Sequence, residues 1–441
     1  MKITGISSDG RGIAHIDGKT VFVSGGVTGD DAVLKITSEK SRFAEAEIAE
    51  IITPSEHRIT PKCPYFQQCG GCNTAHMDYK YELKAKAENV EQTMRRIGGF
   101  KNFKLDSIEY GDDNRYRNKA VYKISGDKCG FYGAKSHDVI NIDDCLLCNE
   151  SDRNIIKAVK KYTETENDEI NELFIRHGKT VMVSLYCGGK LKNADKLPRY
   201  ITAADNNVSS VIVNTPQKTY VIFGDEFIES DLLGVNFRIS EKSFFQVNSL
   251  MTQVLYRKAL DYAAITEKDS VLDIYCGIGT ISLCAAKLAK SVIGVEIVPQ
   301  AIENARYNAK ANGIKNTEFY ASSAEKIVPK LIEKELKPDI VILDPPRKGS
   351  DKSTLAAILS AKPKKIVYVS CNPSTLARDA RILADGGYEI LSACAVDMFP
   401  RTCHVETIVL LPCFKKLKCS LGKNHRRLRR QVNLGLPLSC T

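Results

Sequence analysis

The second half of the chain alternates apolar, strand-like runs with helical patterns, and this alternation constrains the fold more than any other feature. Continuous apolar runs between amphipathic segments indicate parallel strands that helices cover on both faces. Ligands of such sheets bind beyond the carboxyl ends of the strands. The sequence therefore predicts an α/β sheet whose chemistry lies at those ends. The expected strands are 270–275, 291–297, 318–321, 339–343, 365–370, 389–396 and 405–411, and the clearest helices are 299–312 and 375–384.

The rest of the chain divides by pattern into further segments. Residues 1–56 contain Gly-rich turns between short apolar runs, which is typical of a small β-barrel. Residues 57–90 hold a cysteine cluster and a helical pattern, and residues 91–240 indicate a mixed, β-rich central domain. We therefore expect the α/β domain to occupy residues 241–412, and a basic tail of disordered composition to occupy residues 413–441. Extra RNA affinity, or non-native sequence from a frame change, is the alternative interpretation of this tail.

Charge and composition exclude several classes of protein. Hydrophobic residues make up 43% and charged residues 26% of the 441 residues, which excludes a mostly disordered chain. Residues 414–441 carry eight Lys and Arg and no acid, so they supply 8 of the net charge of +10. No apolar run is long enough to span a membrane, and fifteen cysteines are too few for a disulfide scaffold of this length. We expect a cytoplasmic protein with reduced thiols, and infer no obligate protein partner.

The first two strands of the predicted sheet end in residues suited to a nucleoside-containing cofactor. A Gly-x-Gly turn within 273–280 lets the backbone approach a ligand at a helix N-terminus. Ser282 replaces the third glycine of the dinucleotide fingerprint, which argues against NAD or FAD. Glu296 ends the second strand, where a carboxylate can accept both hydroxyls of a ribose. These features resemble the S-adenosylmethionine-binding half of Rossmann-like methyltransferases, although an ordinary solvated glutamate is the alternative for Glu296.

Two later strand ends carry groups for covalent chemistry. Cys371 lies between a strand end and a helix N-terminus, a place that lowers a thiol pKa; Ser374 or Thr375 is expected to cap that helix. Glu406 enters an otherwise apolar strand, where a raised pKa would suit a general base and a salt-bridged glutamate is the alternative. A thiol that adds to C6 of a pyrimidine makes C5 nucleophilic toward a methyl donor, and a base must then remove the C5 proton. Cys371 and Glu406 fit these two roles.

Asp344 ends the fourth strand and is expected beside the cofactor and the base. Two prolines make the loop after it rigid, and Arg347 follows them. Methyltransferases that act on the amines of adenine and cytosine typically have an aromatic residue at that place. Arg347 therefore makes methylation of an exocyclic amine less expected.

Three cysteines lie close together near residue 70. Cys63, Cys69 and Cys72 can meet at one centre because two glycines between the last two permit a sharp turn. A fourth ligand must come from a distant part of the chain, where Cys145 and Cys148 are the candidates. Three local cysteines and one distant cysteine suit a [4Fe–4S] cluster, with zinc as the alternative.

Across residues 1–412 the chain resembles the RNA 5-methyluridine methyltransferases, specifically the iron–sulfur-containing 23S rRNA (uracil-C5) branch. The motifs that carry the resemblance are Phe-Phe-Gln-Val-Asn at 244–248, Asp-x-x-Cys-Gly-x-Gly at 273–279, Asp-Pro-Pro-Arg at 344–347, Ser-Cys-Asn-Pro at 370–373 and His-Val-Glu-Thr at 404–407. The resemblance implies a nucleophile, a base, cofactor contacts and metal ligands. The nucleophile is Cys371 and the base is Glu406. The cofactor contacts are Gln246, Tyr275, Glu296, Asp344, Thr280 and Ser323. The metal ligands are Cys63, Cys69, Cys72 and Cys145.

The resemblance also implies an OB-like (TRAM-type) RNA-binding barrel at the N-terminus, S-adenosylmethionine and a [4Fe–4S] cluster as cofactors, and an RNA substrate whose target base is flipped into the pocket. Arg117 and Lys119 match a motif of the central domain, where phosphate contact and a solvated turn are equal alternatives. Some tRNA-modifying relatives lack the cluster, which favours 23S rRNA over a tRNA. The same chemistry on a tRNA uridine, and a redox-sensing RNA-binding protein without methyl transfer, are the two alternative functions.

Overall fold

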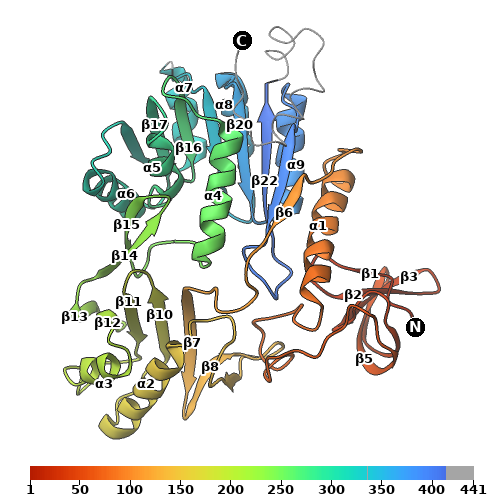
Figure 1. Ribbon diagram of the computed structural model, residues 1–441, viewed down its shortest axis with the longest axis vertical. Coiled ribbons are helices and arrows are strands. Elements are labelled where there is room, and N and C mark those ends of the chain that lie inside the picture. Colours follow the sequence, from red (N-terminus) through yellow and green to blue (C-terminus); the bar gives the residue numbers. More distant parts are fainter. Residues whose placement is uncertain (335, 414–441) are drawn as a thin grey trace. The chain divides into compact units, whose positions relative to one another are not determined.

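The computed structural model describes residues 1–334 and 336–413, and these residues form two compact units (Figure 1). Unit 1 comprises Met1–Asn89, Tyr110–Gln253 and Asp397–Val405. The described part of unit 2 comprises Val90–Glu109 and Val254–Val396 together with the residues from Glu406 to Cys413. The predicted basic tail lies outside the described residues. The helices α1 (Tyr79–Arg96) and α4 (Ser249–Ala263) each contain residues of both units.

The N-terminal part of unit 1 is the small β structure that the turn pattern predicts. Its core consists of apolar side chains that alternate along the strands, such as Val21 and Val23. Asp17 and Gly18 both have positive φ, as a tight two-residue hairpin turn requires. The sheet has the order β1-β2-β3-β5-β4, with β1 (Gly5–Ile6), β2 (Gly12–Ile16), β3 (Lys19–Ser24), β4 (Asp31–Glu39) and β5 (Phe43–Thr53).

The central part of unit 1 is a seven-stranded sheet with two helices and a separate hairpin. Within this sheet, β10 pairs with β11 and β12 pairs with β13 in antiparallel register. The order β13-β12-β11-β10-β7-β8-β9 is formed by β7 (Lys119–Ser125), β8 (Lys128–Tyr132), β9 (Val139–Asn141), β10 (Glu172–His177), β11 (Val181–Tyr186), β12 (Val208–Asn214) and β13 (Thr219–Gly224). The other elements are α2 (Asp152–Glu166), α3 (Leu197–Ala204), β14 (Phe227–Leu232) and β15 (Val235–Ser240).

Unit 2 is the predicted α/β sheet, in which Figure 1 labels β16, β17, β20, β22 and β6. Its strand order is β18-β17-β16-β19-β20-β22-β21-β6. The first five strands are parallel, and their side chains are nearly all buried in β19 and β20. The strands are β6 (Ser107–Glu109), β16 (Ser270–Ile274), β17 (Ser291–Glu296), β18 (Thr317–Ala321), β19 (Ile340–Leu343), β20 (Lys365–Ser370), β21 (Ser392–Val396) and β22 (Glu406–Pro412). The helices are α5 (Thr280–Ala286), α6 (Pro299–Ala311), α7 (Ala324–Glu333), α8 (Lys352–Ala361) and α9 (Pro373–Asp385).

Two features of this sheet differ from the sequence prediction. The sheet is not wholly parallel, because β22 runs antiparallel to both β20 and β21. The short strand β6 joins the sheet beside β21 although residues 107–109 fall in the segment that the sequence assigns to the central domain. Apolar runs do not encode strand direction, and a three-residue strand has too few positions to show a period. No helix of the described part of the chain is long and apolar enough to cross a membrane.

Candidate active site

The turn after β16 has the open backbone that a bound cofactor requires. Tyr275, Gly277 and Gly279 all have positive φ, and Gly279 is the N-cap of α5. A Cβ atom at Gly277 would meet no atom within 4 Å, so space is open beside this turn. Ser282, which replaces the third glycine of the dinucleotide fingerprint, donates a hydrogen bond of 2.5 Å to the buried carboxyl of Asp273. Ser282 of α5 therefore fixes the carboxyl of Asp273 near the end of β16.

Glu296 closes the same turn from the end of β17. Its carboxylate accepts hydrogen bonds from the backbone N–H of Gly277 at 3.2 Å and of Val298 at 3.0 Å. Ser322 donates its backbone N–H to the carbonyl of Glu296 at 2.9 Å, which brings the end of β18 alongside. The hydroxyl of Ser323 is buried and has no hydrogen-bond partner within the described residues. A carboxylate and an unsatisfied hydroxyl at one strand edge fit the polar groups of a nucleoside.

Tyr275 and Thr280 hold their hydroxyl groups toward neighbours in unit 2. The hydroxyl of Tyr275 lies 3.1 Å from that of Ser350, and the hydroxyl of Thr280 lies 3.1 Å from that of Tyr256. Tyr256 is buried, and burial together with the charge of Asp344 raises the pKa of its phenol. Tyr256 lies on α4, outside the motifs of the sequence analysis, and no local pattern would have identified it.

The strand register brings Cys371 and Glu406 together. Ser370 of β20 pairs with Thr407 of β22 in an antiparallel ladder. The next position along each strand therefore places Cys371 opposite Glu406. Asp344 follows β19, the neighbour of β20 on its other side, so all three side chains belong to one end of the sheet. Two carboxyl groups and a thiol thus gather where the alternating pattern predicts chemistry.

Burial and mutual repulsion raise the pKa values of these three groups. Burial, followed by the charge of Asp344, raises the pKa of Glu406 to about 8. Burial and the charge of Asp273 raise the pKa of Asp344 to about 7. Burial, then Glu406 and Asp344, raise the pKa of the Cys371 thiol to about 11, against a smaller opposing effect of Arg347. The predicted lowering of the Cys371 pKa is therefore wrong, because desolvation and two nearby carboxyl groups outweigh the helix N-terminus.

The capping of α9 also differs from the prediction. Asn372, not Ser374 or Thr375, is the N-cap, and its side-chain oxygen accepts a hydrogen bond from the backbone N–H of Ser374 at 3.0 Å. The side-chain amide of Asn372 donates to the carbonyl of Arg347 at 3.0 Å. The residue after Cys371 thus joins the β20–α9 turn to the loop that follows Asp344.

The raised pKa of Glu406 predicts a pH-dependent effect of Glu406→Gln on stability. A carboxyl whose folded pKa of about 8 exceeds its ordinary value of 4.5 stabilises the fold fully below pH 4.5 and loses that contribution as pH rises through 8. Glutamine does not titrate, so the variant should gain free energy of unfolding relative to wild type between pH 5 and 9, on the order of a few kcal/mol. Urea unfolding at both pH values measures this. The exposed Glu389→Gln is the control, and a pH-independent difference for Glu406→Gln would contradict the burial argument.

Gln246 and the four predicted metal ligands lie in unit 1. Gln246 is buried, and its backbone carbonyl accepts a hydrogen bond from the side chain of Asn118 at 3.0 Å. Its backbone is therefore held in unit 1, within a motif that the pattern of apolar residues did not reveal.

The cysteines gather, but they do not form a ligand set for a single ion. Within the described residues no three or more His, Cys, Asp or Glu side chains are arranged to hold a metal ion. Burial raises the pKa of Cys72 to about 12, and the charges of Cys145, Cys63 and Cys69 add to this shift. A hydrogen bond from Cys148 lowers the pKa of Cys145 to about 7. The thiols of Cys63, Cys69, Cys72 and Cys145 therefore lie near enough to affect one another's pKa values, but their arrangement does not identify a metal or a cluster.

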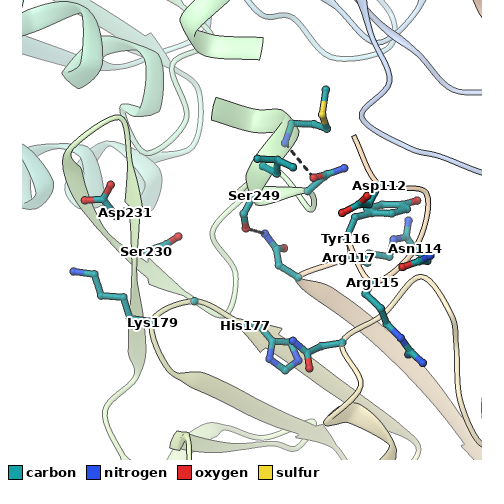
Figure 2. Close-up of a pocket in the computed structure, with 16 residues that line it drawn as sticks. Asp112, Asn114, Arg115, Tyr116, Arg117, His177, Lys179, Ser230, Asp231 and Ser249 are labelled. Atoms are coloured by element: carbon teal, nitrogen blue, oxygen red, sulfur yellow. Dashed lines mark hydrogen bonds between the residues drawn. The ribbon is translucent and has the colours of Figure 1, made fainter. Parts of the chain in front are cut away.

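A polar cavity of about 510 Å³ opens in unit 1. Figure 2 shows Lys179 and Asp231 on one side of it and Tyr116 with Asn114 on the other. Arg117 lines the cavity, and its Nε atom is buried without a hydrogen-bond partner in the described part of the chain. The side chain of Lys119 lies over the ring of Phe174, with its Nζ atom 5.4 Å from the ring centre, and is not among the lining groups. A cavity with cations, amides and an aromatic ring has the composition of a nucleotide-binding surface.

Comparison with known proteins shows the family to which the chain belongs. The sequence profile of the TRAM domain matches residues 1–49, and that of tRNA (uracil-5-)-methyltransferase matches residues 78–413. An RNA methyltransferase of Bacillus cereus whose function is uncharacterised is 39% identical, and the match covers 93% of this chain and 95% of the relative. A similar protein of Clostridium acetobutylicum is 41% identical over 91% of this chain and 94% of its own.

A solved structure shares the fold of most of the chain. The Pyrococcus abyssi tRNA (uracil-54, C5)-methyltransferase in complex with S-adenosyl-L-homocysteine has a TM-score of 0.75 and 28% identity, covering 93% of this chain and 99% of that one. Its bound product of S-adenosylmethionine agrees with the nucleoside-binding features at the ends of β16 and β17. The chain therefore belongs to the tRNA (uracil-5-)-methyltransferase family, as an S-adenosylmethionine-dependent RNA methyltransferase with an N-terminal TRAM domain.

Proposed function

We propose that this enzyme methylates C5 of a uridine in 23S rRNA through a transient covalent bond between Cys371 and C6 of the base. The observation that carries the proposal is the register of β20 and β22, which sets the thiol of Cys371 opposite the carboxyl of Glu406. Methylation of an amine or a hydroxyl needs no such thiol. A redox-sensing RNA-binding protein would need neither group, and family membership argues against it.

The proposed reaction uses each group once. After the thiol has lost its proton to solvent, the sulfur of Cys371 bonds to C6, and the electrons of the C5–C6 double bond become available at C5. S-adenosylmethionine supplies an electrophilic methyl group, which C5 takes as the methyl–sulfonium bond breaks. Glu406 then accepts the C5 proton, the double bond re-forms, and the C6–sulfur bond breaks to release the thiolate of Cys371. A carboxyl with a pKa of about 8 is matched to accepting a proton near neutral pH.

We assign the cofactor to the turn after β16 and to its neighbours. Glu296 would bind the ribose hydroxyls, and the unsatisfied hydroxyl of Ser323 would meet the base. Asp344 would face the positive sulfonium, whose charge would lower the raised pKa values around it. Tyr275, Thr280 and Gln246 complete the proposed set through the family motifs.

Nucleoside analysis tests the reaction and the substrate together. The protein is incubated with labelled S-adenosylmethionine and either unmodified 23S rRNA or unmodified tRNA, and the RNA is digested. Label in 5-methyluridine from rRNA supports the proposal. Label from tRNA alone would support the activity that the Pyrococcus abyssi enzyme's name describes, and label on cytosine or adenine would overturn the reaction.

We propose a [4Fe–4S] cluster held by Cys63, Cys69, Cys72 and Cys145, which would tie the segment after the barrel to the central sheet. Protein purified without oxygen should contain about four iron atoms per chain. Cys72→Ser should lose most of this iron and its visible absorption, whereas Cys129→Ser, a buried cysteine of β8, should keep it. Stoichiometric zinc without iron would contradict the cluster, and a fully folded, active metal-free protein would contradict its structural role.

We propose that the cavity of Figure 2 contacts the RNA backbone. Lys179 is half exposed at its edge, so Lys179→Ala should weaken RNA binding and reduce the slope of log K against log salt by about 1. Filter binding at several salt concentrations gives the slope. Lys128→Ala, on an exposed position of β8 outside the cavity, is the control. An unchanged slope for Lys179→Ala would remove this surface from the interface.

The proposed boundaries of the domains follow the sequence pattern, at residues 1–56, 57–90, 91–240 and 241–412. Residues 397–405 belong to unit 1 although they lie inside the last of these segments.

A further inference from the structure

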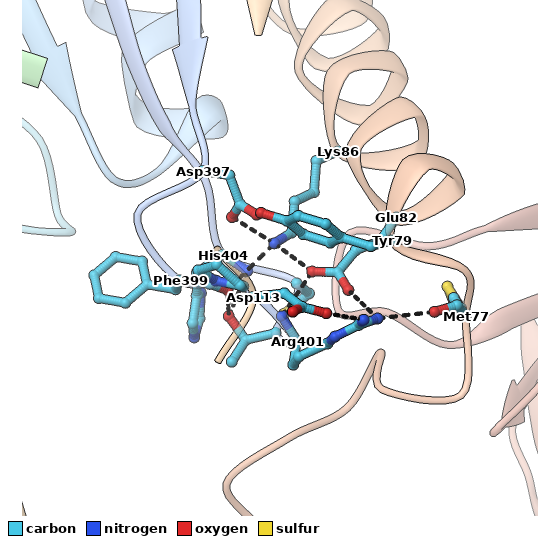
Figure 3. Close-up of polar contacts among 12 residues, drawn as sticks. Met77, Tyr79, Glu82, Lys86, Asp113, Asp397, Phe399, Arg401 and His404 are labelled. Carbon is cyan, nitrogen blue, oxygen red and sulfur yellow. Dashed lines mark hydrogen bonds and ion pairs between the residues drawn. The ribbon is translucent and has the colours of Figure 1, made fainter. Parts of the chain in front are cut away.

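A network of buried charges surrounds the amino group of Lys86 in unit 1 (Figure 3). Its Nζ atom donates to Glu82 at 2.7 Å, to Asp397 at 2.7 Å and to the carbonyl of Phe399 at 3.2 Å. All three donors of the ammonium group therefore have acceptors. Tyr79 donates its hydroxyl to Asp397 at 2.8 Å. Tyr79, Glu82 and Lys86 come from one face of α1, whereas Asp397 and Phe399 belong to the segment 397–405 that follows β21.

Arg401 extends the network further along the same segment. Its backbone N–H donates to Glu82 at 2.8 Å, and its guanidinium donates to the carbonyl of Met77 at 2.9 Å and pairs with Asp113. The backbone of Arg401 has φ +68°, a left-handed conformation that a residue with a side chain rarely adopts. The surrounding hydrogen bonds and ion pair therefore hold the backbone of this residue in a sparsely populated conformation.

The turn after Cys72 holds segment 397–405 from another direction. The backbone N–H groups of Asn73 and Thr74 both donate to the carbonyl of Arg401, at 3.1 and 3.3 Å. The side-chain oxygen of Asn73 accepts the backbone N–H of Cys403 at 2.9 Å. Segment 397–405 is thus bound at both its beginning and its middle by directional contacts.

Directional contacts of this kind specify position more than stability. Replacement of a buried ion pair by apolar side chains of similar volume is often neutral or stabilising, so stability by itself does not account for this network, whereas its directional bonds fix geometry. Segment 397–405 is followed directly by Glu406, the first residue of β22, which pairs with Val396 of β21. A shift of the segment would therefore be passed along the chain to the carboxyl of Glu406.

We propose that the Lys86 network is a positioning device that fixes segment 397–405 and thereby the carboxyl of Glu406. This inference rests on the proposed function, in which Glu406 removes the C5 proton after methyl transfer. Lys86 touches no reacting atom in this scheme and is a positioning residue. Loss of the network should slow the breakdown of the covalent RNA adduct, which needs Glu406, and should leave the formation of the adduct, which needs Cys371, nearly unchanged.

Single-turnover kinetics of adduct formation and breakdown test this proposal with Lys86→Met. Breakdown should slow by tenfold or more, since a displacement of about 1 Å can cost roughly 100-fold in rate. Binding of S-adenosylmethionine should be unchanged, and Lys86→Arg should restore part of the rate. Lys84→Met, on the exposed face of the same helix, is the matched control and should behave as wild type. Tyr79→Phe removes only one hydroxyl from the network and decides the question if Lys86→Met does not fold; it should slow breakdown to a smaller extent.

Two results distinguish the failure of this proposal from the failure of the proposed function. A wild-type enzyme that forms no RNA adduct overturns the covalent chemistry and this inference with it. The positioning role alone is overturned by a different result. In that case the wild type forms the adduct, and a folded Lys86→Met or Tyr79→Phe variant breaks the adduct down at the normal rate, or more slowly only to the extent that adduct formation is also slower.

Discussion

Cys371→Ala is expected to reduce methylation of RNA by roughly 10⁴-fold or more, because loss of a nucleophile removes the covalent route and leaves only binding and orientation. The structure places this thiol at the end of β20 opposite Glu406, and of these two side chains only the thiol can add to C6. The measurement is the initial rate of methyl transfer from labelled S-adenosylmethionine to unmodified RNA.

The matched control is Cys413→Ala, which removes a partly exposed thiol at the opposite end of β22. It should keep the wild-type rate and wild-type binding of S-adenosylmethionine. If Cys371→Ala bound both substrates and methylated RNA at more than a few per cent of the wild-type rate, the covalent mechanism would be wrong. Direct attack of the nucleobase on the methyl group would then have to be considered.

Glu406→Gln is expected to stop the reaction at a later stage. Cys371 and the methyl donor remain, so the methylated adduct should form, but the C5 proton has no acceptor and the C6–sulfur bond cannot break. Turnover should fall by roughly 10²–10⁴-fold. Protein covalently joined to methylated RNA should accumulate and survive denaturing electrophoresis, which the wild type should show only transiently.

Cys371→Ala combined with Glu406→Gln provides the internal control, because the double variant should form no adduct. Glu389→Gln, which changes an exposed carboxylate of unit 2, should keep full activity. An adduct-free Glu406→Gln that still binds RNA would assign the carboxyl to an earlier step, such as the deprotonation of Cys371.

Cys371→Ala and Glu406→Gln test different consequences of the burial of these two side chains. Desolvation raises the pKa values of both Cys371 and Glu406 in the free protein, to about 11 and about 8. For Glu406 this matches the task of a base. For Cys371 it opposes the formation of the thiolate, so the proposed mechanism needs a nearby positive charge, which the sulfonium of bound S-adenosylmethionine would supply.

Local patterns in the sequence were sufficient for the α/β architecture and for the strand-end positions from which the candidate site is proposed. Apolar runs located β16 to β20, and strand-end positions led to the proposal of Glu296, Asp344, Cys371 and Glu406. The strand predictions succeed because burial between helices makes these strands continuously apolar, and the site proposal follows from the rule that ligands of such sheets bind at the carboxyl ends of strands.

Contacts between distant parts of the sequence decided the rest. The antiparallel direction of β22, the addition of β6 to the sheet and the raised pKa of Cys371 all depend on which neighbours surround a residue. The Lys86 network joins α1 to a segment more than 300 positions later, as the separation of Lys86 and Asp397 shows. A sequence records which side chains are available, but hydrogen bonds, desolvation and charge repulsion are set by distances that exist only once the chain has folded.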